Sequence, residues 1–329
     1  MTLNERILYI KGKRNPDGYR FNPFDYIKNR KRAIIICLIL AVGFVFDILC
    51  LCGVTSWQEI LSATNVVDSV KKQDSNFAVY YLDVGQSDCT IVVCDDEVLM
   101  IDTGTFNQSY TIRTNLYMLE IDTIDYMLIT HPHDDHMGSA TEIMEHYRVS
   151  NILMPSLSVE NNVTSLTYNN LLNTVAEKKV NPISVGCGDS FILGSAKVEI
   201  LAPIKQDESI NNMSVVTKIT YGDTSFLFPG DVEDDVEKQI LQNNLHISAD
   251  VLKLGHHGSN TSSSDEFISR VNPDYVIVSS GSDNNYGHPT LNNIEKLGDL
   301  NVKQYFTSVD GHITVTSDGE NITVITQKE

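Results

Sequence analysis

Six consecutive residues, His131-Pro132-His133-Asp134-Asp135-His136, constrain the fold of this chain more than any other stretch. They follow the apolar run 126–129, which is typical of a buried strand, and they precede a helix-like stretch that begins near Ser139. Three imidazoles and two carboxylates within six residues are a poor choice for packing, but they are ligands that zinc, manganese and iron accept. The sequence therefore predicts a divalent metal site at the end of a strand.

The side chains of this motif divide into two sets. In an extended loop, His131 and His133 project to the same side and can clamp one ion. Asp135 and His136, at the turn into the helix, can face a second ion nearby. We therefore expect a site for two metal ions.

Three later motifs place similar residues where strands are expected to end. The apolar run 226–228 leads into Pro229-Gly230-Asp231, and the run 252–254 leads into His256 and His257. The stretch Tyr286-Gly287-His288-Pro289 follows near the C-terminus. The remaining histidines have no such setting, and we expect surface or structural positions for them: His146, His246 and His312.

The order of elements predicts the fold class. Strands are expected at 77–83, 90–94, 97–102, 126–129, 152–154, 190–193, 196–201, 214–220, 224–228, 251–254, 275–278, 302–306, 312–316 and 321–326. Helices are expected at 110–119, 139–148, 164–179, 232–243, 263–271 and 290–298. Strand meanders interleaved with helices, in two comparable halves, predict an α/β fold with two packed sheets and helices outside.

Seven motifs occur in order within residues 77–317: Leu82-Asp83-Val84-Gly85-Gln86, Ile101-Asp102-Thr103-Gly104, residues 131–136, Asn211-Asn212-x-Ser214, Pro229-Gly230-Asp231, His256-His257-Gly258-Ser259 and Tyr286-Gly287-His288-Pro289. This set resembles the metallo-β-lactamase superfamily, and within it the hydrolase domain of the competence protein ComEC and its stand-alone relatives. The resemblance implies the αββα sandwich, in which two packed sheets carry helices on their outer faces.

The resemblance also implies a ligand set for two divalent ions, Zn²⁺ or Mn²⁺. The ligands are His131 and His133 for the first ion, Asp135, His136 and His256 for the second, and Asp231 as the bridge. The choice of His256 over its neighbour His257 rests on the resemblance alone. A water shared by the ions would lose its proton, and the resulting bridging hydroxide would attack a phosphoryl or acyl centre.

Other residues are expected to support this chemistry. Asp135 and Asp231 take part through the ions, and either His257 or His288 stabilises the oxyanion or the leaving oxygen. Asp102 and Asp88 are expected behind the ligands, where they orient them. Three glycines are expected in tight turns: Gly138, Gly230 and Gly258.

The chain departs from the family pattern at two places. The usual DVGQGD reads Asp83-Val84-Gly85-Gln86-Ser87-Asp88, so a positive φ at Ser87 would be strained. Many members of the superfamily supply a third histidine to the first metal, but the corresponding region here offers Asn211, Asn212 and Ser214. The first metal site is therefore expected to bind its ion more weakly, or to be completed by water and an amide oxygen.

The N-terminal part predicts a membrane anchor. Residues 1–32 contain nine Lys and Arg against three Asp and Glu, whereas the remainder contains 15 against 40. Residues 33–54 form 22 nearly unbroken apolar positions, enough to cross a hydrocarbon core of ~30 Å as a helix. The basic flank places residues 1–32 in the cytoplasm. A cleaved signal peptide is one alternative, but no small-residue cleavage pattern follows Val54. A buried core helix is the other, and the length of the run and the basic cluster beside it argue against it.

The predicted organisation is therefore a cytoplasmic basic segment 1–32, a transmembrane helix 33–54, a linker 55–75 and a hydrolase domain 76–329. The localisation that follows is the cell membrane, with one pass, the N-terminus in the cytoplasm and the hydrolase domain extracellular. No protein partner is indicated.

The resemblance implies a metal-dependent hydrolase, a phosphodiesterase or nuclease with extracellular DNA as its leading substrate. DNA affinity rests largely on Lys and Arg, yet residues 77–317 contain no cluster of them beyond the pair Lys178-Lys179. Two alternatives stay open for this reason. One is a hydrolase of a small or wall-linked phosphodiester, such as teichoic-acid phosphocholine. The other is a non-catalytic surface binding module on the same scaffold, against which the complete metal motifs argue.

Overall fold

The computed structural model describes residues 42–45, 48, 69–158, 161, 163–282, 284–300 and 302–328. The chain divides into two compact units, Met1–Val67 and Asp68–Glu329. The predicted basic segment 1–32 and most of the predicted transmembrane helix and linker lie outside the described residues. Among the residues that are described, no helix combines the length and the apolar character needed to cross a membrane.

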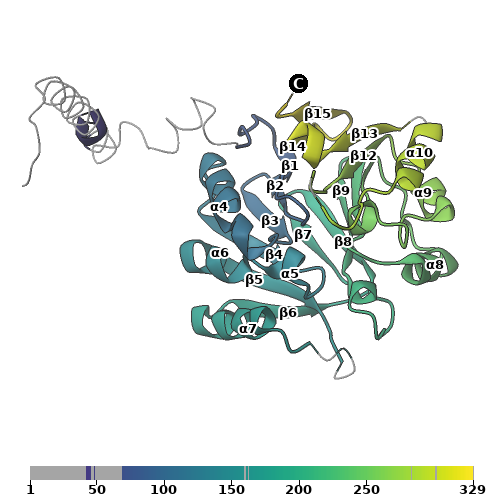
Figure 1. Cartoon of the computed structure of the whole chain (residues 1–329), viewed down its shortest axis with the longest axis horizontal. Helices are drawn as coiled ribbons and strands as arrows, with labels where there is room; N and C mark the ends of the chain where they lie inside the picture. Colours follow the sequence, from purple (N-terminus) through teal and green to yellow (C-terminus); the bar gives the residue numbers. More distant parts are fainter. Residues whose placement is uncertain are drawn as a thin grey trace, which may run out of the picture. The chain divides into compact units, whose positions relative to one another are not determined.

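Two β-sheets form the centre of the second unit (Figure 1). The first has the strand order β15-β14-β1-β2-β3-β4-β5-β6 and the second the order β13-β12-β11-β10-β9-β8-β7. The first sheet comprises β1 Phe77–Tyr81, β2 Thr90–Cys94, β3 Glu97–Ile101, β4 Thr123–Leu128, β5 Arg148–Pro155, β6 Asn181–Val185, β14 Ile313–Ser317 and β15 Ile322–Thr326. The second comprises β7 Ser190–Leu193, β8 Ala196–Ala202, β9 Val216–Tyr221, β10 Thr224–Phe228, β11 Val251–Lys253, β12 Tyr275–Val278 and β13 Lys303–Phe306.

Helices cover the outer face of each sheet (Figure 1). The first sheet carries α4 Ser109–Met118, α6 Ala140–His146 and α7 Leu166–Lys178. The second carries α8 Asp234–Gln242, α9 Asp265–Val271 and α10 Leu291–Asp299. Short helical turns complete the described elements: η1 Phe106–Gln108, α5 Asp134–Met137, η3 Asn211–Met213, η4 Gly255–Gly258 and α11 Thr307–Asp310. The predicted αββα sandwich is confirmed.

Strand β1 shows why the central strands are apolar on both sides. Phe77 and Tyr81 face the core between the sheets, where their rings lie 5.1 Å from Phe226 and 6.0 Å from Phe228 by centroid. The intervening Tyr80 faces the opposite core, under the helices. Successive side chains in a strand point to opposite faces, so a strand covered on both sides must be apolar throughout.

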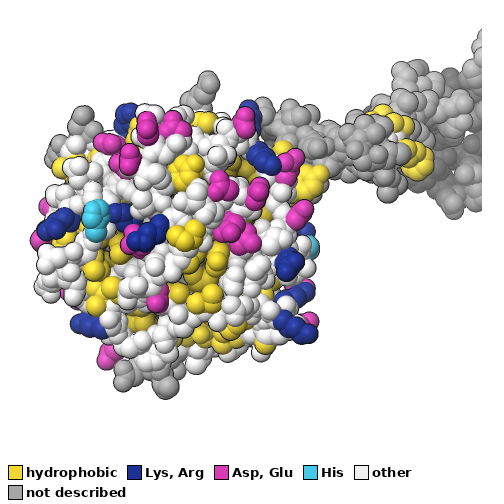
Figure 2. Space-filling model, turned by 180° about the vertical axis from the view of Figure 1, so that it is seen from behind, with side chains coloured by type: hydrophobic (Ala, Val, Ile, Leu, Met, Phe, Trp, Pro, Cys, Tyr) yellow, Lys and Arg dark blue, Asp and Glu magenta, His cyan; other side chains and the backbone are white. Residues whose placement is uncertain are grey.

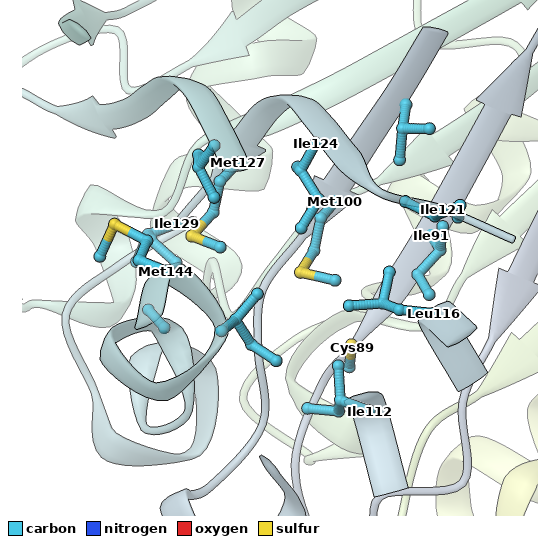
Figure 3. Packing of buried hydrophobic residues seen from close by; sticks show 14 of the residues in the cluster. Cys89, Ile91, Met100, Ile112, Leu116, Ile121, Ile124, Met127, Ile129 and Met144 are labelled. Carbon is cyan, nitrogen blue, oxygen red and sulfur yellow. The ribbon is translucent and has the colours of Figure 1, made fainter. Parts of the chain in front are cut away.

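The helical layers follow from the 3.6-residue period. On α4, Ile112 and Leu116 lie one turn apart and pack in the same core as Ile91 and Met100 of the first sheet (Figure 3). Residues at positions i and i+4 share one face of a helix. The helix therefore buries one stripe and leaves Tyr110 and Tyr117 exposed.

One strand is missing from the sequence prediction. Residues 181–185, which follow the predicted helix 164–179 and were assigned to no element, form β6 at the edge of the first sheet. Proline cannot donate a ladder hydrogen bond and is tolerated at sheet edges, and Pro182 occupies such an edge strand. The remaining predicted strands and helices lie within a few residues of those observed.

The sheet topology brings several strand ends together. Strands β3, β4 and β5 are parallel neighbours, and so are β10, β11, β12 and β13. The carboxyl ends of parallel strands meet at one edge of a sheet, where open α/β sheets place their ligand sites. The predicted metal motifs directly follow β4, β10 and β11.

Candidate metal centre

Four buried side chains from both halves of the fold converge on one point: Asp88, His136, Asp231 and His257. Each offers one ligand atom, and these atoms all lie within 4.8 Å of one another. Asp88 and His136 come from loops of the first sheet, whereas Asp231 and His257 come from loops of the second. The cluster therefore lies where the two sheets meet.

The loop after β4 places the HPHDDH side chains around this cluster. His131 and His133 lie together, with 2.9 Å between Nε2 of the first and Nδ1 of the second. His136 Nε2 lies 3.2 Å from Asp231 Oδ2, and Asp135 Oδ2 lies 3.8 Å from His136 Nε2. The two sets expected from the sequence are thus adjacent, with Asp231 within reach of both.

Asp102 fixes the His136 ring from behind. Its Oδ2 accepts a hydrogen bond of 2.8 Å from His136 Nδ1 and another of 2.8 Å from the Thr130 hydroxyl. Its Oδ1 accepts from the Thr130 backbone N–H at 2.8 Å. Because Nδ1 is occupied as a donor, Nε2 is the ring atom turned toward the cluster, as in carboxylate–histidine–metal arrangements.

Asp231 follows β10 and is surrounded by imidazoles. Its Oδ2 lies 3.6 Å from His256 Nε2 and 3.9 Å from Nε2 of both His131 and His257. Gly230, with φ of 61°, makes the turn that aims this carboxylate at the cluster. The Asp231 backbone N–H is in turn held by Ser214 Oγ at 3.1 Å.

The loop after β11 has an unusual backbone. His256 and His257 have φ of 48° and 52°, in the left-handed region that non-glycine residues rarely adopt. Strain of this kind clusters at functional sites, and here it turns both rings toward the carboxylates. His257 Nδ1 donates to the Ser279 carbonyl oxygen at 3.0 Å, while its Nε2 lies 3.4 Å from Asp135 Oδ2.

The two candidate histidines of this loop differ in burial. His257 is buried and belongs to the convergent group, and it contacts Asp88, Asp135 and Asp231. The His256 side chain is 20% exposed; its Nε2 lies 3.6 Å from Asp231 Oδ2, and its Nδ1 lies 3.2 Å from the Thr261 hydroxyl. The geometry therefore makes His257 a candidate ligand for the second ion, in addition to His256, which the sequence resemblance favours.

The carboxylates and imidazoles perturb one another strongly. Burial alone lowers the pKa of the His257 imidazole, but Asp88, Asp231 and Asp135 outweigh it and raise this pKa to about 10. The pKa of His136 likewise stands well above its ordinary range, because Asp231 and Asp102 overcome the effect of burial. Burial holds the pKa of His131 well below its ordinary range, so that ring stays neutral.

Unpaired atoms show that the cluster fits a metal ion. Oδ1 of Asp88, Nε2 of His136, Oδ1 of Asp231 and Nε2 of His257 are buried without a hydrogen-bond partner, while Oδ2 of Asp88 pairs with the Lys253 ammonium at 2.6 Å. Buried polar groups are rarely left unpartnered, and imidazole nitrogens and carboxylate oxygens are ligands for divalent transition metals. The donor set and its orphaned atoms therefore agree with the metal site that the sequence predicts.

Residues Asn211, Asn212 and Ser214 stand in the sequence region that supplies a third histidine to the first metal in many members of the superfamily. Asn211 lines the cleft above the cluster, and its buried Oδ1 has no hydrogen-bond partner. Asn212 Oδ1 instead accepts from the Glu233 backbone N–H, and Ser214 Oγ lies 3.2 Å from His131 Nδ1. Of these three side chains, Asn211 alone offers an unpaired oxygen toward the cleft.

A cleft of about 430 Å³ opens onto the cluster. His288 lies on its wall, with its ring 5.7 Å from that of His256. Burial lowers the pKa of His288, so the ring is neutral at neutral pH. Tyr286 and Gln86 also line the cleft. No Lys or Arg is among its lining residues in the part of the chain that the structure describes.

Residues 82–163 match the family model described as the metallo-beta-lactamase superfamily. That segment of the chain is similar to metallo-β-lactamase domains. The chain is 30% identical over 194 residues to ComE operon protein 3 of Bacillus subtilis, covering 59% of this chain and 24% of that protein. It is 28% identical over 245 residues to Recombination protein 2 of Haemophilus influenzae, covering 71% of this chain and 28% of that protein.

The chain spans about a quarter of the length of these curated relatives. Among solved structures it resembles CmlA, a diiron beta-hydroxylase from Streptomyces venezuelae, with a TM-score of 0.51 at 15% identity. That likeness covers 79% of this chain and 59% of the other, and it concerns the fold alone.

Some residues lie elsewhere in the structure than the sequence predicts. Asp88, expected behind the ligands, lies among them, and Lys253, for which no role is predicted from the sequence, is buried with its Nζ 2.6 Å from Asp88 Oδ2. The sequence feature that could have indicated this buried lysine is its position at the end of an otherwise apolar strand. His312, expected at the surface or in a structural position, is structural: it is buried and its Nδ1 accepts from the Asp83 backbone N–H.

Two expectations about small residues are refined. Gly138 lies in a turn between α5 and α6, as predicted, but this turn does not need positive φ; Gly138 has right-handed helical φ, and a Cβ there would lie 2.6 Å from Phe106 N. Close backbone approach is therefore what requires this glycine. Ser87 is not strained either, because the positive φ falls on Gly85 while the buried Ser87 hydroxyl donates to the Val84 carbonyl.

Proposed function

We propose that this chain is a metal-dependent phosphodiesterase that acts on extracellular DNA. The observation that carries the proposal is the buried cluster of carboxylates and imidazoles, with unpaired atoms, at the bottom of an open cleft. Divalent ions bound there, Zn²⁺ or Mn²⁺, would lower the pKa of a water and offset charge that develops on phosphoryl oxygens.

The ligands of two ions are proposed from the contacts of the cluster. The first ion would be held by His131 and His133, with Asn211 as an added oxygen donor. The second ion would be held by Asp135, His136, Asp88 and either His256 or His257. Asp231 lies close enough to both sets to bridge the two ions. Asp102 holds the His136 ring in the required orientation.

The protein's own groups complete the chemistry. His288, neutral on the cleft wall, is positioned to donate an N–H to a substrate oxygen. The His257 Nδ1–H is already committed to the Ser279 carbonyl, so this ring contributes through Nε2. We therefore assign stabilisation of the leaving oxygen to His288 rather than to His257.

The substrate proposal draws on the relatives, because surface charge alone does not favour DNA. The name Recombination protein 2 associates that relative with DNA. On the face seen in Figure 2, Lys and Arg side chains lie scattered among Asp and Glu and form no continuous basic surface over the described residues. A small or wall-linked phosphodiester is the second candidate, favoured by a cleft that no Lys or Arg lines among the described residues.

The membrane anchor remains part of the proposal. Residues 33–54, with the basic residues before them, support a single-pass anchor that leaves the metallo-β-lactamase domain outside the cell. Protease treatment of intact cells and of permeabilised cells tests this topology. We expect the domain to be digested in both, and protection of the domain in intact cells would contradict the proposal.

The catalytic proposal is tested on the purified full chain. Bound metal is determined first, and cleavage of bis-p-nitrophenyl phosphate and of linear DNA is then followed with added Mn²⁺ or Zn²⁺. The test variant is His133→Ala with Asp135→Ala, and the control is His146→Ala, which removes an exposed imidazole at the end of α6. We expect both substrates to be cut by the wild type and the control, but not by the double variant.

Each other result has a definite reading. Cleavage of the small diester alone favours the small or wall-linked substrate. Metal binding without cleavage of either substrate contradicts the phosphodiesterase assignment, and failure to bind metal supports the non-catalytic binding module.

A further inference from the structure

An exposed aromatic ring stands at the mouth of the metal cleft. Tyr286 is 74% exposed, and it lines the same cleft as the metal cluster. Its ring stacks on that of His288, with centroids 5.9 Å apart and an angle of 27° between the planes. The row of rings continues from His288 to His256, beside Asp231.

The loop that carries Tyr286 is held in place by one amide side chain. Asn284 Oδ1 accepts from the backbone N–H of Tyr286 at 3.2 Å and of His288 at 3.0 Å. Its Nδ2 donates to the carbonyl oxygens of Gly281 and His288. A loop backbone held in this way loses little conformational freedom when the side chain that it carries binds a ligand.

The charges in the cleft make an aromatic contact valuable. Asp134, Asp135 and Asp231 line the cleft, and no described Lys or Arg does. A nucleic acid bound here therefore gains nothing from side-chain cations at the cleft wall. Proteins that hold single strands also use aromatic rings, on which bases of any kind stack.

We propose that Tyr286 is a stacking platform for an unpaired nucleobase next to the phosphodiester that is cut. The proposal rests on the proposed function and narrows its substrate to a single strand. A base in a duplex is stacked on both faces and must be unstacked to reach the ring, whereas a base of a single strand reaches it directly. His288, directly behind Tyr286, then faces the phosphate beside the stacked base.

The test compares strands that differ only in their bases. The purified full chain with Mn²⁺ is assayed on an oligothymidylate and on an oligonucleotide of the same length in which abasic residues replace the thymidines. We expect Tyr286→Ala and Tyr286→Leu to lower the preference for the base-bearing strand, measured as the ratio of KM values, about tenfold. Tyr286→Phe should keep the preference, because it keeps the ring.

Tyr110→Ala is the matched control, since it removes an exposed tyrosine from α4, away from the cleft. If Tyr286→Ala changes KM equally for both strands, or if Tyr286→Leu retains the preference, the stacking role is wrong. A change in bound metal in Tyr286→Ala would likewise indicate a structural role.

Binding separates this inference from the catalytic proposal. Tyr286→Trp places an indole at the platform, and its fluorescence is titrated with the same two strands, against the wild type for the signal of Trp57. Quenching by the base-bearing strand alone supports stacking even if nothing is cleaved. Equal or absent quenching with both strands refutes it, whatever the cleavage assay shows.

Discussion

Lys253 Nζ lies 2.6 Å from Asp88 Oδ2, and both side chains are buried beside the metal cluster. The other oxygen of Asp88 lies 3.5 Å from His257 Nδ1. Burial alone raises the pKa of the Asp88 carboxyl, but Lys253, followed by His257 and His136, overcomes that effect and lowers it below its ordinary value. The lysine therefore keeps Asp88 ionised and in place at the bottom of the site.

Lys253→Met should destabilise the metal-free protein. Removing one partner of a buried ion pair leaves the other charge uncompensated, which costs about 3–5 kcal/mol. Urea unfolding of the metal-free chain measures the loss. The control is Lys197→Met, which removes an exposed pair with Glu199 and should cost less than about 1 kcal/mol. Equal losses in the two variants would show that Lys253 is not paired as described.

Metal binding should release protons. The pKa of His257 is raised from 6.5 to about 10, mainly by carboxylates that overcome burial, so its ring is protonated in the metal-free protein at neutral pH. A metal can bind Nε2 only after that proton leaves. Metal affinity should therefore increase as the pH rises toward about 10.

The same shift has an opposite effect on the metal-free fold. Stabilisation by the protonated His257 is complete below pH 6.5 and is lost as the pH rises through about 10.

Proton release on metal binding is measured by calorimetric metal titrations in buffers of different ionisation enthalpy, which count the protons released. His257→Gln should release fewer. An affinity that does not change with pH, with no protons released, would contradict the prediction.

Asp102→Asn should weaken metal binding without removing a ligand. The amide cannot accept from both His136 Nδ1 and the Thr130 groups that now share Asp102, so the ring loses its orientation. Loss of such an orienting carboxylate typically lowers metal affinity about 10- to 100-fold. Competition with a chelator measures the change, and Asp318→Asn, in an exposed turn, is the control that should retain full affinity.

Gly138→Ala should be destabilising although alanine favours helices. Its Cβ would lie 2.6 Å from Phe106 N and 2.8 Å from Gly104 O, both backbone atoms. Overpacking of this kind costs about 1–3 kcal/mol. In Gly298→Ala the new Cβ meets nothing within 4 Å, and this change in α10 should stabilise by about 0.5–1 kcal/mol. Thermal unfolding of both variants should show shifts of opposite sign.

The αββα fold could be predicted because the strands and helices carry strong local signals. The HPHDDH loop, Gly230-Asp231 and the His256-His257 pair could be found because ligand types gather where apolar strands end. Sequence spacing did not show that Asp88 faces the cluster, since its position depends on how the loop after β1 folds back. Its backbone N–H bonds to the Asp135 carbonyl at 3.1 Å, a contact between distant segments.

The roles of Lys253 and Asn284 were hidden for a related reason. Lysine at a strand end is ordinarily solvated, and only the packing of the second sheet buries Lys253 against Asp88. Asn284 sits in a polar loop, and its four hydrogen bonds follow from the loop conformation rather than from any motif. In the left-handed segment of His256 and His257, the His256 backbone N–H donates to the Gly230 carbonyl at 3.0 Å, a contact with another loop.

The four convergent ligands come in pairs from opposite sheets, Asp88 and His136 from one, Asp231 and His257 from the other. An ion bound by all four side chains would link the two sheets of the sandwich. Without the ion, the negatively charged carboxylates of Asp88 and Asp231 would face one another between the two sheets. Lys253 and the protonated imidazoles would then offset their repulsion. Such a domain would resist heat and proteases best when it holds metal, so scarcity of metal would shorten its lifetime.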